Sequence, residues 1–136
     1  MRLYSIAALL LRKTISDYKV PGTKYVIEKD VVVIIPVDAI HRDPDIYTNP
    51  EIFDPSRFSA AEIEKRHAMS WLPFGEGPRN CIGLRFGEMQ SLIGLAMLIN
   101  NFKVYPSNET KDPIEIDPKS FVLASKGGIV LKLQKI

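Results

Sequence analysis

The pattern of hydrophobic and polar positions predicts strands in the first third of the chain. Residues 31–35 form a dense β-branched run, which favours a strand. Residues 25–27 predict a second strand, and the short polar break at 28–30 between the two favours a hairpin. Pro21 and Gly22, a strong turn pair, precede this hairpin.

Residues 37–70 carry a different pattern, which is broken by Asp-Pro and Asn-Pro pairs. Such pairs mark turns, and a residue before proline is pushed away from helical angles. This stretch therefore predicts a long ordered meander, and long loops in compact domains are usually functional or tied down. Four aromatic side chains are candidates for tying it down: Tyr47, Phe53, Phe58 and Trp71.

The last third predicts one long helix and a closing hairpin. Residues 84–100 contain no proline and are apolar on most sides, which is typical of a helix buried in a larger body. Beyond them, residues 121–124 and 129–131 have β-forming composition and flank the turn-forming residues 125–128. Together these elements predict an α+β chain.

Composition narrows the class of protein. The chain has 136 residues, 46% of them hydrophobic and 25% charged, which fits one soluble globular domain rather than a disordered or fibrous chain. A formal net charge of +2 gives no indication of a nucleic-acid partner. A single cysteine excludes an intrachain disulfide and fits a reducing compartment. No segment has the length of a transmembrane helix, and residues 1–11 are interpreted as part of the fold rather than as a signal peptide.

The candidate chemistry lies in the cysteine loop, residues 72–83, which is rich in glycine and proline and delivers Cys81 to the start of the long helix. A helix N-terminus presents unpaired N–H groups and partial positive charge, and both favour a thiolate. Gly75 and Gly83 let the backbone approach a flat ligand without a Cβ in the way. The loop therefore has the character of a metal-thiolate site.

Two more side chains of the cysteine loop suit such a ligand. Arg79 can pair with a carboxylate of the bound group, and the ring of Phe74 can shield the sulfur from water. One alternative is an ordinary buried cysteine, which is the commoner role of a lone thiol. Another is a phosphate- or nucleotide-binding module, because glycine-rich loops before helices bind phosphate. The loop lacks the Walker lysine and does not match G-x-G-x-x-G, which disfavours that reading.

Five residues of the cysteine loop carry a family resemblance: Phe74, Gly77, Arg79, Cys81 and Gly83 match the signature F-x-x-G-x-R-x-C-x-G of the cytochrome P450 family. The resemblance implies the C-terminal part of that mainly helical fold, with β hairpins, a long meander, a cysteine loop and one long buried helix. It also implies that Cys81 is the proximal ligand to the iron of haem b (iron protoporphyrin IX). Electron donation from such a thiolate favours cleavage of the O–O bond.

The meander extends the resemblance. Residues 53–58 resemble the family motif F-x-P-E-R-F, with Ser56 in place of the usual glutamate and Arg57 as its arginine. Residues 41–44 resemble the segment that precedes this motif. There, His41 is more typical of a structural hydrogen-bonding residue than of a metal ligand.

Further resemblances concern the first strand and the substrate pocket. Arg12 matches a family arginine that pairs with a haem propionate; an exposed arginine beside Lys13 is the alternative. Residues 6–11 and 122–125 resemble segments that line the substrate pocket, and their apolar character suits a small lipophilic substrate, with core packing as the alternative. The expected haem-binding set is Arg12, Phe74, Gly75, Arg79, Cys81 and Gly83.

The resemblance implies a monooxygenase that inserts one oxygen atom of O2 into its substrate. The haem performs the oxygen chemistry, and the protein supplies the ligand, orientation and electrostatics. Electrons are expected from an NADPH-dependent flavoprotein reductase. The residues around the loop most resemble microsomal insect detoxification-type members, which implies the cytosolic face of the endoplasmic reticulum membrane.

Parts of the family pattern are expected to lie outside residues 1–136. Arg2 matches the arginine of the family's E-x-x-R motif, whose glutamate would precede residue 1. Arg2 and Arg57 would then be like charges lacking their carboxylate, which is costly when buried. The oxygen-activating helix and the N-terminal membrane anchor are also not in the sequence. We therefore expect residues 1–136 to be the truncated C-terminal haem-binding part of a cytochrome P450 domain, inactive alone and membrane-bound only through the missing anchor.

Overall fold

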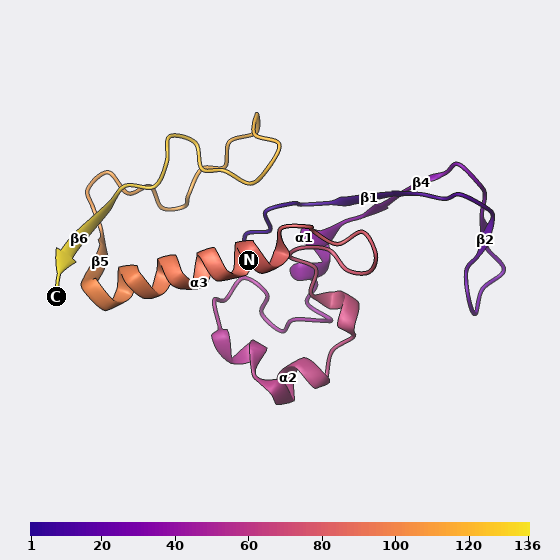
Figure 1. The fold of residues 1–136 in the computed structure, drawn as a ribbon, viewed down its shortest axis with the longest axis horizontal. Helices are drawn as coiled ribbons and strands as arrows, with labels where there is room; N and C mark the ends of the chain where they lie inside the picture. The colour runs from indigo at the N-terminus through magenta and orange to yellow at the C-terminus, as the bar shows by residue number, and fades with distance from the viewer. The chain divides into compact units, whose positions relative to one another are not determined.

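A computed structural model describes all 136 residues and divides them into two compact units, unit 1 (Met1–Pro73) and unit 2 (Phe74–Ile136) (Figure 1). Unit 1 contains β1 (Leu10–Lys13), β2 (Tyr18–Lys19), β3 (Val26–Ile27), β4 (Val32–Ile35), α1 (Val37–His41), the 3₁₀ helix η1 (Pro55–Phe58), α2 (Ala60–Glu64) and the 3₁₀ helix η2 (Ala68–Ser70). Unit 2 contains α3 (Leu84–Asn101), β5 (Phe102–Pro106) and β6 (Leu131–Lys135). One long helix with small antiparallel sheets confirms the predicted α+β class.

The strands of unit 1 form two nested antiparallel pairs. β1 pairs with β4, from Leu10 opposite Ile35 to Lys13 opposite Val32. β2 pairs with β3 around a turn in which Gly22 has a φ of 73°, a value that favours glycine. The predicted pairing of residues 25–27 with 31–35 is therefore wrong, although both strands exist.

The connection between β3 and β4 explains the difference in pairing. Val31 N donates to Thr14 Oγ1 at 3.0 Å, and Thr14 N donates to the Val31 carbonyl at 3.0 Å. Lys13 Nζ lies 2.8 Å from the carboxylate of Asp30, which has a φ of 67°. These contacts hold residues 28–31 against the end of β1, so the chain continues along β1 instead of reversing onto β3.

The meander of unit 1 contains short helices that begin at its turn residues. Asp54 caps η1 by accepting a hydrogen bond from Ser56 N at 3.0 Å, which leaves Pro55 at the first helical position, where its missing N–H costs nothing. Tyr47 is buried, and its hydroxyl donates to the Ser70 carbonyl at 3.0 Å. Phe58 packs edge-on to Trp71, but Phe53 is 80% exposed, so the prediction of Phe53 as an anchor is wrong.

The core of unit 1 is small and largely polar. Its buried hydrophobic residues are Val37, Tyr47 and Leu72. Its buried polar residues are Arg2, Ser5, His41 and Ser70. Because a buried polar group needs a partner, the hydrogen bonds among these residues decide the stability of unit 1.

Unit 2 consists of α3 followed by a two-stranded ribbon. α3 extends one residue beyond the predicted 84–100. β5 pairs antiparallel with β6, from Phe102 opposite Lys135 to Pro106 opposite Leu131. The predicted hairpin of residues 121–124 with 129–131 is therefore wrong. β6 pairs instead with β5, a five-residue strand of β-forming composition.

The side chains of α3 are not buried within the chain. Leu92 is 69% exposed and Leu95 is 59% exposed. This apolar surface agrees with the sequence-based expectation that α3 belongs inside a larger body. No helix of the chain, α3 included, combines the length and apolar character needed to cross a bilayer.

Candidate functional site

The cysteine loop closes through its own backbone. Cys81 N–H donates to the Phe74 carbonyl at 2.8 Å, and Asn80 N–H donates to the Gly77 carbonyl at 3.2 Å. Gly75 and Gly77 have φ values of 71° and 81°, which an L-residue adopts only with strain. The loop therefore depends on its glycines and main chain, and it leaves the Cys81 side chain exposed.

The N-terminus of α3, which carries the partial positive charge of the helix dipole, directly follows this loop. Gly83 is the N-cap residue and makes no side-chain capping bond, and the first turn contains no acidic residue. Leu84 N–H donates to the Cys81 carbonyl at 3.2 Å, so the helix begins directly behind the cysteine. Uncapped N–H groups and the helix dipole both favour an anion near this end.

Gly87 lets the ring of Phe74 lie close to α3. A Cβ added at Gly87 would meet Phe74 Cε1 at 3.3 Å, which is tighter than most real contacts. Sequence reasoning assigned no role to this glycine. The available signal was a glycine inside a helix, where alanine is favoured by about 1 kcal/mol unless packing opposes it.

We expect Gly87→Ala to stabilise α3 less than Gly94→Ala. At Gly94 an added Cβ meets nothing within 4 Å, so alanine there should raise the free energy of unfolding by about 1 kcal/mol. At Gly87 the Phe74 ring must shift, which offsets that gain. Urea unfolding followed by far-UV circular dichroism measures both variants, and equal gains would contradict the close contact.

Five of the six residues expected to bind haem lie in this one loop. Phe74 is half-buried, Arg79 and Cys81 are exposed, Gly75 has a φ of 71°, and Gly83 lies in the turn before α3. A Cβ at Gly83 would lie 3.9 Å from Cys81 Sγ, an ordinary contact.

Arg12 lies on β1 of unit 1, opposite Val33, and its Nη1 donates to the Leu11 carbonyl at 2.9 Å. The structure thus places Arg12 on a strand and groups the other five residues in the loop.

Arg2 is buried with hydrogen bonds to backbone carbonyls rather than to a carboxylate. Its guanidinium donates to the carbonyls of His41 at 2.8 Å, Pro50 at 2.5 Å and Ile52 at 3.1 Å. Burial lowers the pKa of Arg2, and the positive charge of Arg57 lowers it further. The expected juxtaposition of these two like charges is therefore present in unit 1.

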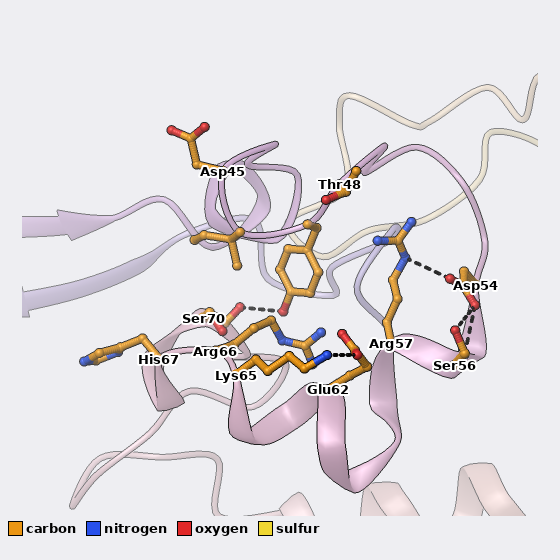
Figure 2. Close-up of a pocket in the computed structure, with 12 residues that line it drawn as sticks. Asp45, Thr48, Asp54, Ser56, Arg57, Glu62, Lys65, Arg66, His67 and Ser70 are labelled. Atoms are coloured by element: carbon orange, nitrogen blue, oxygen red, sulfur yellow. Dashed lines mark hydrogen bonds and ion pairs between the residues drawn. The ribbon is translucent and has the colours of Figure 1, made fainter.

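Arg57 lies in a pocket of about 410 Å³ formed by the meander (Figure 2). Figure 2 shows Arg57 turned toward Asp54, with Lys65 paired to Glu62 nearby. Arg57 Nε lies 3.8 Å from the Asp54 carboxylate, too far for a hydrogen bond, and is buried without a hydrogen-bond partner. None of the residues expected to bind haem lines this pocket.

The residues of the cysteine loop fit a haem-iron ligand. The thiol is exposed, Gly75 and Gly77 of the same loop have positive φ values, and the N-cap of α3 makes no side-chain hydrogen bond. This arrangement leaves the sulfur accessible to a large planar group.

Comparison with known proteins agrees with this site. The family model described as Cytochrome P450 matches residues 1–132. The chain therefore belongs to the cytochrome P450 family, as the cysteine-loop signature predicted.

Insect proteins are among its similar relatives. Over 137 residues the chain is 52% identical to cytochrome P450 6a2 of Drosophila melanogaster, covering 100% of the chain and 27% of that protein. Over 133 residues it is 50% identical to cytochrome P450 6B2 of Helicoverpa armigera, covering 98% and 26%. The chain thus spans about a quarter of the length of the curated relatives it matches, and the resemblance to insect members is confirmed.

Proposed function

We propose that this chain supplies the proximal ligand of a haem-thiolate monooxygenase, with Cys81 Sγ as the ligand to the iron of haem b. The observation that carries the proposal is the exposed Cys81 thiol, held by a backbone-closed loop at the uncapped start of α3. Family membership over residues 1–132 supports it. Residues 1–136 then form the C-terminal haem-binding part of a cytochrome P450 domain.

The other residues of the set have distinct roles in this proposal. Arg79 and Arg12 each offer a guanidinium for a haem propionate, since arginine binds carboxylates through paired hydrogen bonds. The Phe74 ring excludes water from the sulfur side, and Gly75 and Gly83 leave room for the macrocycle. When bound, the haem supplies O2 activation and transfer of one oxygen atom.

The activity of the whole protein is part of the same proposal. We infer insertion of one oxygen atom into a small lipophilic substrate, with electrons from an NADPH-dependent flavoprotein reductase. The cytosolic face of the endoplasmic reticulum membrane is the inferred location. Support comes from family membership and from the insect relatives named cytochrome P450; no nucleic-acid partner is inferred.

We expect Cys81→Ser to abolish thiolate ligation of haem. The 136-residue chain is titrated with hemin, reduced and exposed to carbon monoxide, and its absorption spectrum is recorded. A thiolate-type Soret band is expected for the unmodified chain and should be absent in Cys81→Ser, because a serine hydroxyl does not replace the electron-donating sulfur.

The matched control is Ile15→Ser, which introduces the same side chain at a position that is 89% exposed in unit 1. It should keep the band. A thiolate-type band that survives Cys81→Ser would contradict the assignment of the ligand. A lack of haem uptake by the unmodified chain would contradict haem binding by this segment on its own.

A further inference from the structure

The β2–β3 hairpin extends beyond the β1–β4 pair and is held by its own hydrogen bonds (Figure 1). Val20 N–H donates to the Tyr25 carbonyl at 3.0 Å, and Thr23 N–H closes the turn on the Val20 carbonyl at 3.2 Å. At the base of the hairpin, Lys29 N–H donates to the Asp17 carboxylate at 2.8 Å. The hairpin therefore presents its side chains on a backbone that its own bonds hold in place.

One face of this hairpin is apolar and aromatic. Tyr18 lies opposite Ile27, and the same register places Val20 opposite Tyr25. Because alternate residues of a strand share a face, these four side chains lie on one side of the hairpin. Tyr18 is 53% exposed and Tyr25 is 65% exposed. Tyrosine suits a boundary between apolar and wet surroundings, since its ring is apolar and its hydroxyl is polar.

The charge of the hairpin is positive toward its turn. Between Tyr18 and Ile27 the sequence has Lys19 and Lys24 and no acidic residue. None of the ion pairs in the structure includes either lysine. Lys24 Nζ lies 6.0 Å from the centroid of the Tyr25 ring. The hairpin thus combines exposed aromatic rings with two cations that have no carboxylate partner.

This combination differs from the exposed apolar surface of α3. The helix has no charged residue after Glu88 and no tyrosine or tryptophan. Such a surface is typical of a helix inside a protein. Tyrosine together with lysine is typical of a membrane interface, where the ring lies at the level of the headgroups and the lysine reaches the lipid charges.

We propose that the β2–β3 hairpin docks on a membrane surface that contains anionic phospholipids. Tyr18 and Tyr25 enter the headgroup region, and Lys19 and Lys24 bind the anionic groups of the lipids. Each lysine near an anionic surface strengthens such binding several-fold, and salt weakens it. The inference rests on the proposed location at the endoplasmic reticulum membrane, and it adds a second contact to the membrane anchor expected for the family.

The test places a fluorescent label on the hairpin of the full 136-residue chain. Cys81→Ser removes the only cysteine, and Val26→Cys, at a position that is 53% exposed, accepts an environment-sensitive dye. With vesicles of equal parts phosphatidylcholine and phosphatidylserine, the emission should rise several-fold, and lipids with a nitroxide at the headgroup should quench it. Emission that does not respond to these vesicles would overturn the proposal.

Two pairs of lysines give a charge-matched comparison in the labelled chain. Lys19→Gln with Lys24→Gln should weaken binding to the mixed vesicles by about 10- to 30-fold. Lys132→Gln with Lys135→Gln removes the same charge from exposed positions of β6 and should weaken binding by less than about 3-fold. Equal losses for the two pairs would show that binding follows net charge alone, which is contrary to docking by the hairpin.

A matched pair of tyrosine variants tests the aromatic face. Tyr25→Ser should lower the affinity for the mixed vesicles by about 5- to 10-fold, because binding scales with the apolar area that enters the interface. Tyr4→Ser changes a tyrosine of unit 1 that is 51% exposed and lies outside the hairpin, and it should leave the affinity unchanged. The same affinity for both variants would exclude a role for the Tyr25 ring.

A label on α3 separates docking of the hairpin from adsorption of apolar surface. Leu95→Cys, at a position that is 59% exposed, replaces Val26→Cys in the same Cys81→Ser chain. Vesicles that change the emission at Leu95 but not at Val26 would overturn docking by the hairpin and leave the proposed membrane location intact. Emission at Val26 that rises with protein concentration without vesicles would assign the hairpin to contact with a second copy and overturn the proposal.

The outcome is independent of the ligand role of Cys81. Every labelled chain has serine at position 81, so vesicle binding is measured without thiolate ligation of haem. Absence of the thiolate-type Soret band in the hemin experiment would overturn the ligand role, and the emission at Val26 still decides whether the hairpin docks on the membrane.

Discussion

Arg2→Met is expected to lower the free energy of unfolding of unit 1 by about 3 kcal/mol. Arg2 is 5% exposed, and its guanidinium donates to the carbonyls of three residues that lie 39, 48 and 50 positions further along the chain: His41, Pro50 and Ile52. Methionine fills similar volume but donates nothing, so these carbonyls lose their partner. Removal of one of two neighbouring positive charges offsets part of the cost, because Arg57 already disfavours the charged form of Arg2.

Urea unfolding followed by the fluorescence of Trp71 measures this loss, because Trp71 is the only tryptophan and lies in unit 1. The control is Lys13→Met, which removes a cation whose ion pair with Asp30 is well exposed. Such surface pairs contribute less than about 1 kcal/mol. If both variants lose the same small amount, the hydrogen bonds of Arg2 do not hold unit 1 together.

Acidification is expected to remove about 3 kcal/mol of stability through His41 alone. Burial lowers the pKa of His41 to about 4; the nearby Asp38 carboxylate raises it, and the charges of Arg2 and the Met1 amino group lower it. The unfolded chain therefore binds the proton first as the pH falls. The contribution of His41 is fully present above about pH 6.5, declines between 6.5 and 4, and is lost below about pH 4.

The difference in unfolding free energy between the unmodified chain and His41→Gln isolates this contribution, because the Asp and Glu carboxylates titrate in both proteins. The difference should shrink by about 3 kcal/mol between about pH 7 and pH 4. In the folded chain Leu72 N–H donates to His41 Nε2 at 2.9 Å. Protonation turns Nε2 into a donor, so this bond should break over the same pH range. A difference that stays constant with pH would show that His41 does not remain neutral in the folded chain.

Local sequence patterns predicted the positions of helices and strands in this chain better than they predicted which strands pair. α3 was predicted to within one residue because a proline-free run of helix formers carries its own signal. Residues 31–35 were predicted as a strand, but their pairing with β1 depends on Thr14 and Asp30, which lie outside the strand itself. Strand pairing is a non-local property, and two β-forming segments close in sequence do not have to meet.

The candidate site could be predicted at positions where the backbone conformation favours one residue type. Gly75 and Gly77 have the left-handed backbone that favours glycine in a loop. The ligand role of Cys81 stays a prediction that rests on the match to the family signature.

His41 was predicted to be a structural hydrogen-bonding residue, and its bonds to Leu72 N–H and Ser5 Oγ confirm this. The contact of Gly87 with Phe74 and the identity of the partners of His41 could not be identified from spacing. Both depend on which side chains meet in three dimensions, as does the exposure of Phe53 beside the burial of Tyr47.

The cysteine loop is closed by main-chain hydrogen bonds, so its conformation does not depend on several of its side chains. Pro78 and Asn80 are exposed and lie between the glycine turns and the cysteine. The Asn80 contact that matters to the loop is made by its main-chain N–H, not by its amide side chain. Charge can therefore be introduced at Asn80 to tune the electrostatic potential near the sulfur while the loop keeps its path. Under the proposed ligand role of Cys81, Asn80 is therefore the position at which a charge would change the reduction potential of the bound iron with least effect on the loop.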